Sequence, residues 1–117
     1  MRIEVGTDIV NIKRIQKSID KFGDKFLDRF LDENEKILAN KIESIAGFWA
    51  AKEAISKALG CGIGKELSFL DIKIKKDNNN KPYFYLVNNK FNIINSSISI
   101  SHDSSFAIAT ALIVFKD

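Results

Sequence analysis

The spacing of hydrophobic positions changes along the chain, and each change predicts a different element. Residues 2–10 alternate loosely between apolar and polar side chains, which predicts a strand that ends near residues 6–8. Apolar residues then recur every three or four positions over residues 12–30, the spacing of one face of a helix. Gly23 lies inside this stripe, so two helices are expected there rather than one.

Two further helices are predicted before the middle of the chain. Asp32 followed by Glu35 has the spacing of a capping box, which indicates the start of a short helix. Residues 44–59 are rich in Ala and free of Pro, and they form the most helical stretch of the chain. Gly60 stands where a left-handed residue would end that helix.

The second half of the chain has the pattern of strands. Residues 68–76 and 83–88 flank a turn-forming run at 77–82, so they predict a hairpin. Residues 97–101 and 106–115 predict a second hairpin. Because helices come first and an antiparallel meander second, we expect an α+β fold, with the N-terminal strand and helices packed on a small antiparallel sheet.

Composition narrows the class of protein. A chain of 117 residues suits a single domain over 1–117, and its size allows a packed core without a disulfide or metal staple. One Cys and one His exclude a disulfide framework and the usual zinc site, and the single Cys favours a reducing, cytoplasmic compartment. No apolar run reaches the roughly 18 residues of a membrane span, and the first ten residues do not resemble a signal peptide.

Charge is mildly positive and concentrated near the first helices. The net charge is +3, and 15 of the 18 cations are Lys, which disfavours bidentate Arg readout of bases. Cations recur every four positions along one stretch, with Arg14 beside the first: Lys13, Lys17, Lys21, Lys25 and Arg29. This stretch is either a solvated face of mixed charge or a docking surface for an acidic partner. A nucleic-acid-binding module is the alternative from another class, and no RNP, KH or helix-turn-helix pattern supports it.

Two carboxylates are candidates for chemistry. Asp8 is interpreted either as the N-cap of the helix over 11–21 or as a ligand for a hard cation. Glu53 lies one helical turn before Lys57 among small residues. The two are either an i,i+4 pair on a solvated face or a carboxylate and an ammonium that hold Mg²⁺ and a phosphate together.

Two turns carry further candidates. The loop at 60–65 is either a helix C-cap followed by a turn or a cradle for phosphate or adenosine, and its glycine spacing does not match a Walker loop. Cys61 within it is interpreted as an ordinary loop residue rather than a nucleophile. His102 is either a local hydrogen-bonding residue or a donor to a ligand phosphate.

Taken together, these motifs resemble those of the holo-acyl carrier protein synthases, the small type of 4′-phosphopantetheinyl transferase. The resemblance covers nearly the whole chain, with the motifs in the family's order and at matching spacing. It is carried by Gly6-Thr7-Asp8-Ile9-Val10, Trp49-Ala50-Ala51-Lys52-Glu53-Ala54, Lys57-Ala58-Leu59-Gly60, Gly62-Ile63-Gly64, Lys81-Pro82 and Ser99-Ile100-Ser101-His102.

The resemblance implies an enzyme that moves the 4′-phosphopantetheine group from coenzyme A to a serine of apo-acyl carrier protein, releasing 3′,5′-ADP for fatty acid biosynthesis. It implies that Asp8 and Glu53 hold Mg²⁺, or Mn²⁺ in its place. Glu53, or a water that it shares with the metal, would be the base, and Lys57 would stabilise or protonate the leaving phosphate.

The resemblance also implies binding residues and an assembly. Coenzyme A would be contacted by Lys57, Gly60, Gly62, Gly64, Lys65, Asn80, Lys81, Pro82, Ser101 and His102. The acidic carrier would meet Arg14, Lys17, Lys21 and Lys25. The resemblance implies the 4′-phosphopantetheinyl transferase fold for each chain. It also implies that three chains assemble into a homotrimer with active sites at the subunit interfaces, where the neighbouring subunit supplies some coenzyme contacts.

Three positions depart from the family's pattern. Phe48 stands where Arg is usual, Asn80 where Gly precedes Lys-Pro, and Phe106 where some relatives have Tyr. The alternative within the enzyme class is a transferase of broad specificity for other carrier proteins, against which the short length argues.

Overall fold

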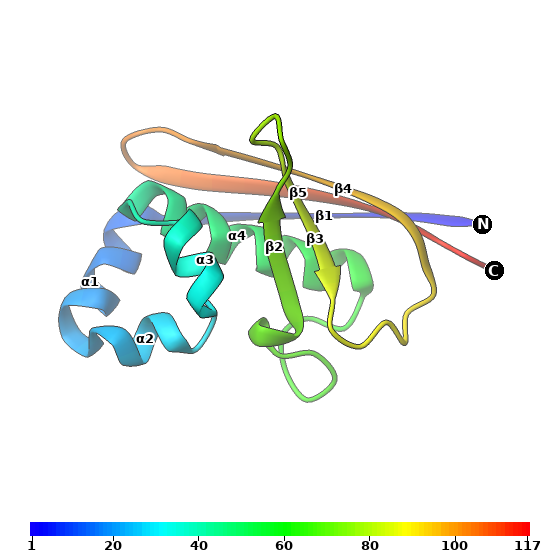
Figure 1. Cartoon of the computed structure of the whole chain (residues 1–117), viewed down its shortest axis with the longest axis horizontal. Coiled ribbons are helices and arrows are strands. Elements are labelled where there is room, and N and C mark those ends of the chain that lie inside the picture. Colours follow the sequence, from blue (N-terminus) through cyan, green and yellow to red (C-terminus); the bar gives the residue numbers. More distant parts are fainter.

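A long helix lies along a three-stranded sheet, and a separate hairpin stands on the far side of that helix (Figure 1). The computed structural model describes all residues from 1 to 117. Its elements are β1 (Arg2–Asn11), α1 (Ile12–Phe22), α2 (Asp24–Asp28), α3 (Glu33–Leu38), α4 (Ile42–Leu59), a 3₁₀ turn (Phe69–Asp71), β2 (Ile72–Lys76), β3 (Pro82–Leu86), β4 (Ile93–His102) and β5 (Phe106–Phe115).

The strands form two sheets. The larger sheet has the order β1-β5-β4, and every neighbouring pair is antiparallel. The smaller sheet contains only β2 and β3. The α+β class predicted from the sequence is therefore confirmed, although the strands divide between two sheets.

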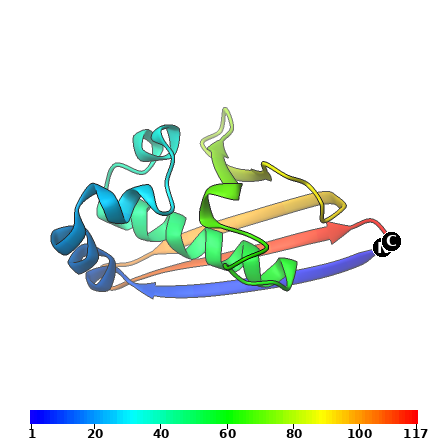
Figure 2. The same cartoon turned by 90° about the horizontal axis from the view of Figure 1, so that it is seen from below.

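Helix α4 is the centre of the core. Small side chains such as Ala50, Ala51 and Ala54 are fully buried, and they let α4 approach its neighbours closely. Figure 2 shows α4 between the three-stranded sheet on one side and the β2–β3 hairpin and α3 on the other. No other element covers the opposite face of the three-stranded sheet.

Local signals placed the helices correctly. Gly23 has φ +59° and separates α1 from α2, as predicted. The capping box between Asp32 and Glu35 is present, with Asp32 Oδ1 accepting from the Glu35 N–H at 2.8 Å and Glu35 Oε1 accepting from the Asp32 N–H at 2.9 Å. Gly60 ends α4 in the left-handed conformation with φ +84°.

Two strands are longer than predicted because of their pairing with β5. The first runs to Asn11 instead of ending near residues 6–8, since its ladder with β5 continues to the pair Asn11↔Phe106. The fourth begins at Ile93 rather than at residue 97, with a bulge between Ile93 and Asn95. Periodicity alone does not report such a partner.

The β2–β3 hairpin is shorter than predicted. Residues 69–71 form a 3₁₀ turn instead of strand, because Ser68 and Asp71 cap each other and Ser68 O accepts from the Asp71 N–H. Strand β3 covers Pro82–Leu86 rather than 83–88. Asn80 takes φ +63° in the turn, a left-handed conformation that asparagine tolerates.

Candidate active site

The candidate catalytic residues meet where β1 lies on α4. Gly6 and the side chains of Asp8 and Val10 lie on the more buried face of β1, while the residues between them are exposed. Gly6 permits the contact, because a Cβ there would lie 2.0 Å from the carbonyl oxygen of Ala54. The absence of a side chain at residue 6 therefore brings Asp8 up to α4.

Lys57 reaches from α4 to β1. Its Nζ donates to Asp8 Oδ1 at 3.1 Å and to the carbonyl oxygen of Thr7 at 3.0 Å. The ion pair of Lys57 is thus with Asp8, and not the i,i+4 pair with Glu53 that the spacing also allowed.

The interpretation of Asp8 as a helix cap is wrong. The N-cap of α1 is Asn11, whose Oδ1 accepts from the Lys13 N–H at 2.9 Å. Asp8 lies three residues earlier, inside the strand, with a side chain that is 16% exposed. Its carboxylate is therefore directed to the contact with Lys57.

Glu53 completes this group of charges. It is half-buried on α4, one turn before Lys57. Burial raises the pKa of Glu53, and the negative charge of Asp8 raises it further, while the cations Lys57 and Arg14 lower it. Two carboxylates that repel in this way are stabilised by a cation placed between them.

The two carboxylates fit a magnesium ion that shares its ligands with a substrate. No group of three or more His, Cys, Asp or Glu side chains is arranged to hold a metal by itself. Mg²⁺ is commonly held by one or two carboxylates together with substrate phosphates and waters. Asp8 and Glu53 offer such a donor set.

The loop after α4 behaves as a helix C-cap followed by a turn. The N–H groups of Gly60, Gly62 and Gly64 donate to the carbonyl oxygens of Lys57, Ser56 and Leu67 respectively. These three N–H groups are occupied within the chain, so a ligand would meet the exposed side chain of Lys65 here rather than the glycine backbone.

Cys61 in the same loop is a free, half-buried thiol. Burial raises the pKa of Cys61, and the charge of Glu66 raises it further. The thiolate is the nucleophilic form of cysteine, so a raised pKa agrees with the sequence interpretation of an ordinary loop residue.

A cleft of about 200 Å³ lies between α4, the β2–β3 hairpin and β4. It gathers the predicted coenzyme-binding residues Asn80, Pro82 and His102. Sequence reasoning did not assign its other lining residues to a site: Glu43, Ser44, Phe48, Lys76 and Ile100. Two of them had a signal in the sequence, because Lys76 borders the predicted turn and Phe48 stands where the resembling family usually has Arg.

Two other predicted coenzyme contacts lie beside this cleft without lining it. Nζ of Lys81 donates to the Ile98 carbonyl oxygen at 3.4 Å and so connects the hairpin to β4. Ser101 lies in a shallow hollow with Ile9 and Phe106, which His102 also lines.

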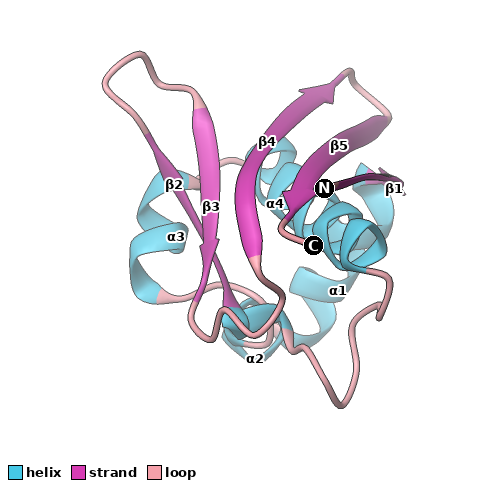
Figure 3. Ribbon diagram, turned by 90° about the vertical axis from the view of Figure 1, so that its right-hand side faces the viewer, coloured by secondary structure: helices cyan, strands magenta, loops and turns pink.

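Within one chain, the carboxylate site and the cleft belong to opposite edges of the three-stranded sheet. Asp8 lies on the edge strand β1, and His102 lies on the other edge strand β4, with β5 between them. Figure 3, which looks along the sheet, shows the hairpin beside β4 and away from β1. The structure therefore does not bring all the predicted site residues of one chain together.

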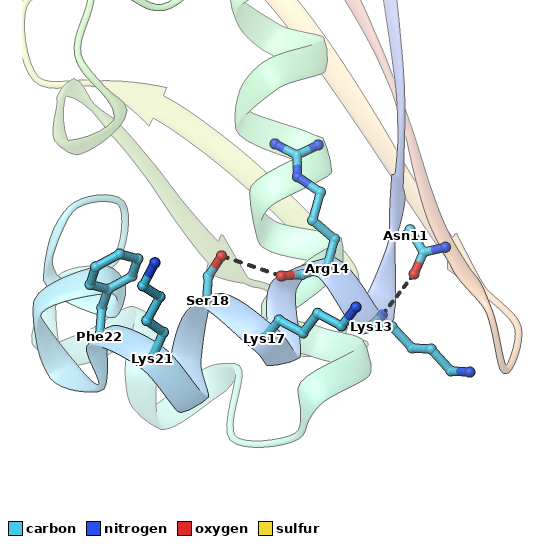
Figure 4. A pocket seen from close by; sticks show the side chains of 7 residues that line it. All are labelled: Asn11, Lys13, Arg14, Lys17, Ser18, Lys21 and Phe22. Carbon is cyan, nitrogen blue, oxygen red and sulfur yellow. Dashed lines mark hydrogen bonds between the residues drawn. The ribbon is translucent and has the colours of Figure 1, made fainter.

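A basic groove of about 590 Å³ follows α1 (Figure 4). Its lining contains four cations and no carboxylate: Asn11, Lys13, Arg14, Lys17, Ser18, Lys21 and Phe22. The predicted carrier-binding residues Arg14, Lys17 and Lys21 are thus gathered on one surface.

The groove continues in both directions. Lys25 lines a smaller adjoining hollow with Phe22, Phe26 and Arg29. On the other side, Arg14 extends from α1 toward α4 (Figure 4), where its charge acts on Glu53. The basic surface therefore borders the carboxylate site.

Known proteins are similar to this chain both in fold and in sequence. The model of the 4′-phosphopantetheinyl transferase superfamily matches residues 4–111. The chain therefore belongs to that superfamily, the class that its motifs indicated.

Individual relatives are more specific. The holo-[acyl-carrier-protein] synthase of Sulfurovum sp. is 53% identical, with 97% of this chain and 98% of the relative covered. The crystal structure of Helicobacter pylori holo-[acyl-carrier-protein] synthase in complex with coenzyme A is 54% identical with a TM-score of 0.91, covering 94% and 99% of the two chains. A Bacillus anthracis holo-(acyl-carrier-protein) synthase structure with coenzyme A (3′,5′-ADP) is 41% identical with a TM-score of 0.83, covering 97% and 96%. The resemblance to this family of transferases is confirmed.

No helix of the structure combines the length and the apolar character that crossing a membrane requires.

Proposed function

We propose that this chain transfers the 4′-phosphopantetheine group of coenzyme A to a serine hydroxyl of apo-acyl carrier protein, in support of fatty acid biosynthesis. The observation that carries the proposal is the meeting of Asp8, Glu53 and Lys57 at the contact between β1 and α4. The serine oxygen forms a bond to the β-phosphorus of the coenzyme. The bond from that phosphorus to the bridging oxygen breaks, and 3′,5′-ADP leaves.

Each of the three side chains has a role in this transfer. Asp8 and Glu53 would hold Mg²⁺, or Mn²⁺ in its place, against the pyrophosphate. When bound, the metal supplies positive charge to the phosphate oxygens. Lys57, held beside Asp8, stabilises or protonates the leaving phosphate, and Glu53 or a water next to it accepts the serine proton.

The cleft by the hairpin is our proposed site for the adenosine end of coenzyme A. Phe48, Pro82 and Ile100 offer apolar surface to a purine, while Lys76 and His102 are the groups able to meet the 3′-phosphate. Phe48 is 3% exposed, so the residue that replaces the usual Arg packs into the cleft wall.

We further propose a homotrimer in which the cleft of one subunit completes the carboxylate site of its neighbour. The open face of the three-stranded sheet supports the assembly, since it exposes six large apolar side chains: Ile3, Val5, Ile9, Phe106, Ile108 and Leu112. An apolar face of this kind is typical of a protein interface. The placement of the two half-sites on opposite edges supports their sharing between subunits.

The basic groove along α1 is the proposed docking surface for the acidic carrier protein. Its cations lie beside the carboxylate site, so a docked carrier would present its serine to Glu53 and Lys57. Cys61 is the single cysteine of the chain and is free, which favours the proposed reducing, cytoplasmic location.

The test is the intact mass of a carrier incubated with the purified chain, coenzyme A and Mg²⁺. We expect a gain of one phosphopantetheine arm, loss of the gain with EDTA, and recovery with added Mg²⁺ or Mn²⁺. Glu53→Ala should abolish transfer, whereas Lys116→Ala, at the far end of the sheet, should not. No gain with a folded carrier would refute the proposal, and a panel of other carriers would reveal broad specificity.

A further inference from the structure

Two charged side chains are buried at the centre of the molecule and take no part in the proposed chemistry. Lys52 is 0% exposed and Glu35 is 1% exposed. Nζ of Lys52 donates to Glu35 Oε1 at 2.9 Å and to the carbonyl oxygens of Phe30 and Phe69 at 2.6 and 3.1 Å. All three ammonium donors therefore have acceptors inside the core.

The carboxylate of Glu35 is equally well satisfied. Its Oε1 also accepts from the Asp32 N–H at 2.9 Å, and its Oε2 accepts from the Ile74 N–H at 2.9 Å. The ion pair thus connects the turn after α2, the first half of α3, the middle of α4, the 3₁₀ turn and the backbone of β2.

Stability alone does not account for this pair. A buried ion pair loses as much free energy by desolvation as it regains by attraction, and apolar replacements of similar volume are often as stable. The surroundings here are apolar and well packed, with the rings of Phe30, Trp49 and Phe69 within 6.1 Å of one another. What the pair adds to this packing is directional bonding at fixed positions.

The element most affected by that bonding is the β2–β3 hairpin. The hairpin shares no strand pairing with the three-stranded sheet, so no backbone ladder sets its register there. Glu35 accepts from the Ile74 N–H in the middle of β2, and Lys52 donates to the Phe69 carbonyl oxygen in the 3₁₀ turn that leads into β2. Two other polar contacts connect the hairpin to the rest of the chain. The side chains of the ion pair between Lys73 and Asp32 reach the surface. The hydrogen bond from Lys81 Nζ to the Ile98 carbonyl oxygen is longer, at 3.4 Å.

The hairpin also forms one wall of the cleft. Lys76, two residues after Ile74 on β2, lines it together with Asn80 and Pro82. The facing wall is α4, where Phe48 lies one turn before Lys52. A shift of the hairpin on α4 therefore changes the separation of the two walls directly.

We propose that Glu35 and Lys52 are positioning residues for the coenzyme cleft, which set the placement of the β2–β3 hairpin on α4 and thereby the affinity for the nucleotide end of the coenzyme. The inference rests on the proposed function, in which this cleft receives adenosine and its 3′-phosphate. Neither residue touches the substrate.

The main test is the double substitution Glu35→Leu with Lys52→Met, which leaves no unpaired charge in the core. We expect a folded protein whose KM for coenzyme A and Kd for 3′,5′-ADP rise about tenfold or more, as displaced binding walls do. The KM for the carrier should stay within about twofold, because the α1 groove makes no contact with the pair. Lys36→Met, which removes the ion pairs with Asp28 and Glu33 on the outer side of the same helix α3, is the matched control and should change neither constant.

Two further measurements keep the inference testable under every outcome. Glu35→Asp retains the charge but shortens the side chain, so it should show the same selective rise if the double variant does not fold. In the absence of any coenzyme, hydrogen exchange at the Ile74 amide should accelerate and the amide resonance of Asn80 should shift.

The result that overturns the inference is a folded variant with unchanged 3′,5′-ADP binding and unchanged amide signals. An equal rise of both KM values would also overturn it, since a general loss of structure acts on both. Failure of the unaltered chain to transfer phosphopantetheine would instead refute the proposed function, and the amide measurements would still decide the positioning role.

Discussion

Lys57 has a different ion-pair partner in the structure from the one that its position in the sequence suggests. By spacing alone it belongs with Glu53 on one helix face, yet its ammonium bonds to Asp8 and to the Thr7 carbonyl on β1. The side chain is 52% exposed, and an ion pair of that exposure contributes little to folding. Its position next to the carboxylates is better explained by a task in catalysis.

Replacing Lys57 by Met should therefore separate activity from stability. Removing a cation that stabilises charge developing on a leaving group typically lowers kcat by about 10²–10³-fold. We expect a loss of that size in the carrier mass assay and a melting temperature close to that of the unaltered chain. Lys116→Met, an exposed lysine near the chain termini, is the comparison for charge alone. Retention of kcat by Lys57→Met would remove this residue from the transfer step.

At the scale of elements, the contact of β1 with α4 sets the site. A Cβ on Gly6 would lie 2.0 Å from the Ala54 carbonyl oxygen and 2.7 Å from the Ala58 nitrogen, both backbone atoms that side-chain movement cannot relieve. Gly6→Ala should push the strand away from the helix and destabilise the fold by about 1–3 kcal/mol or more. It should also lower transfer, because Asp8 moves with β1.

The matched control for Gly6→Ala is Gly64→Ala. A Cβ on Gly64 would have no neighbouring atom within 4 Å, and the residue has no positive φ, so the added methyl group should be tolerated. Thermal unfolding and the carrier mass assay on both variants check the prediction. Equal stability of the two variants would contradict the role assigned to the β1–α4 contact.

The turn between β4 and β5 gives a prediction about pH. Oδ1 of Asp103 accepts from the Ser105 and Phe106 N–H groups, and the Ser105 carbonyl accepts from the Ile12 N–H at the start of α1. The hydrogen bonds from Phe106 and then Ser105 hold the pKa of Asp103 below its usual value. Because the folded pKa is lowered, this stabilisation is present above about pH 4 and is lost as the pH falls further.

Asp103→Ala should accordingly lower the melting temperature at neutral pH. The difference from the unaltered chain should narrow as the pH falls below about 4, where the carboxyl of the unaltered chain takes up a proton. Asp77→Ala, which alters a turn at the tip of the other hairpin, controls for the loss of a turn carboxylate in general. A difference that stays constant with pH would contradict the assignment.

The elements could be predicted from the sequence where the signal was local. The helix break at Gly23, the left-handed cap at Gly60 and the capping box at Asp32 depend on neighbours within a few residues, and all three were expected. The extent of β1 and the placement of Lys76 in the cleft depend on partners far along the chain. A single sequence does not show which distant residues will be in contact, so these features became visible only in the three-dimensional structure.

At the scale of the whole molecule, the cations of the basic groove are gathered at one end of the structure. The basic groove lies on α1, at the end opposite to the chain termini (Figure 1). Lys17→Glu should raise the carrier KM about tenfold at low salt and leave the coenzyme A KM unchanged. At about 0.5 M salt the difference should shrink, because screening weakens attraction between exposed charges. Lys116→Glu, near the termini, should leave the carrier KM as it is, and an equal effect of both substitutions would exclude a localised docking surface.

The division of the site between opposite edges of the sheet leads to the last prediction. If Asp8 and Glu53 of one subunit work with the cleft of another, Glu53→Ala and His102→Ala damage different halves of each shared site. Each variant alone should have little activity. Trimers formed by refolding the two together should regain part of it, because some interfaces then pair an intact carboxylate site with an intact cleft. Mixing without subunit exchange is the control, and native mass measurement reports the mixed species. Mixed trimers that remain inactive would show that each chain must bind coenzyme A with its own residues alone.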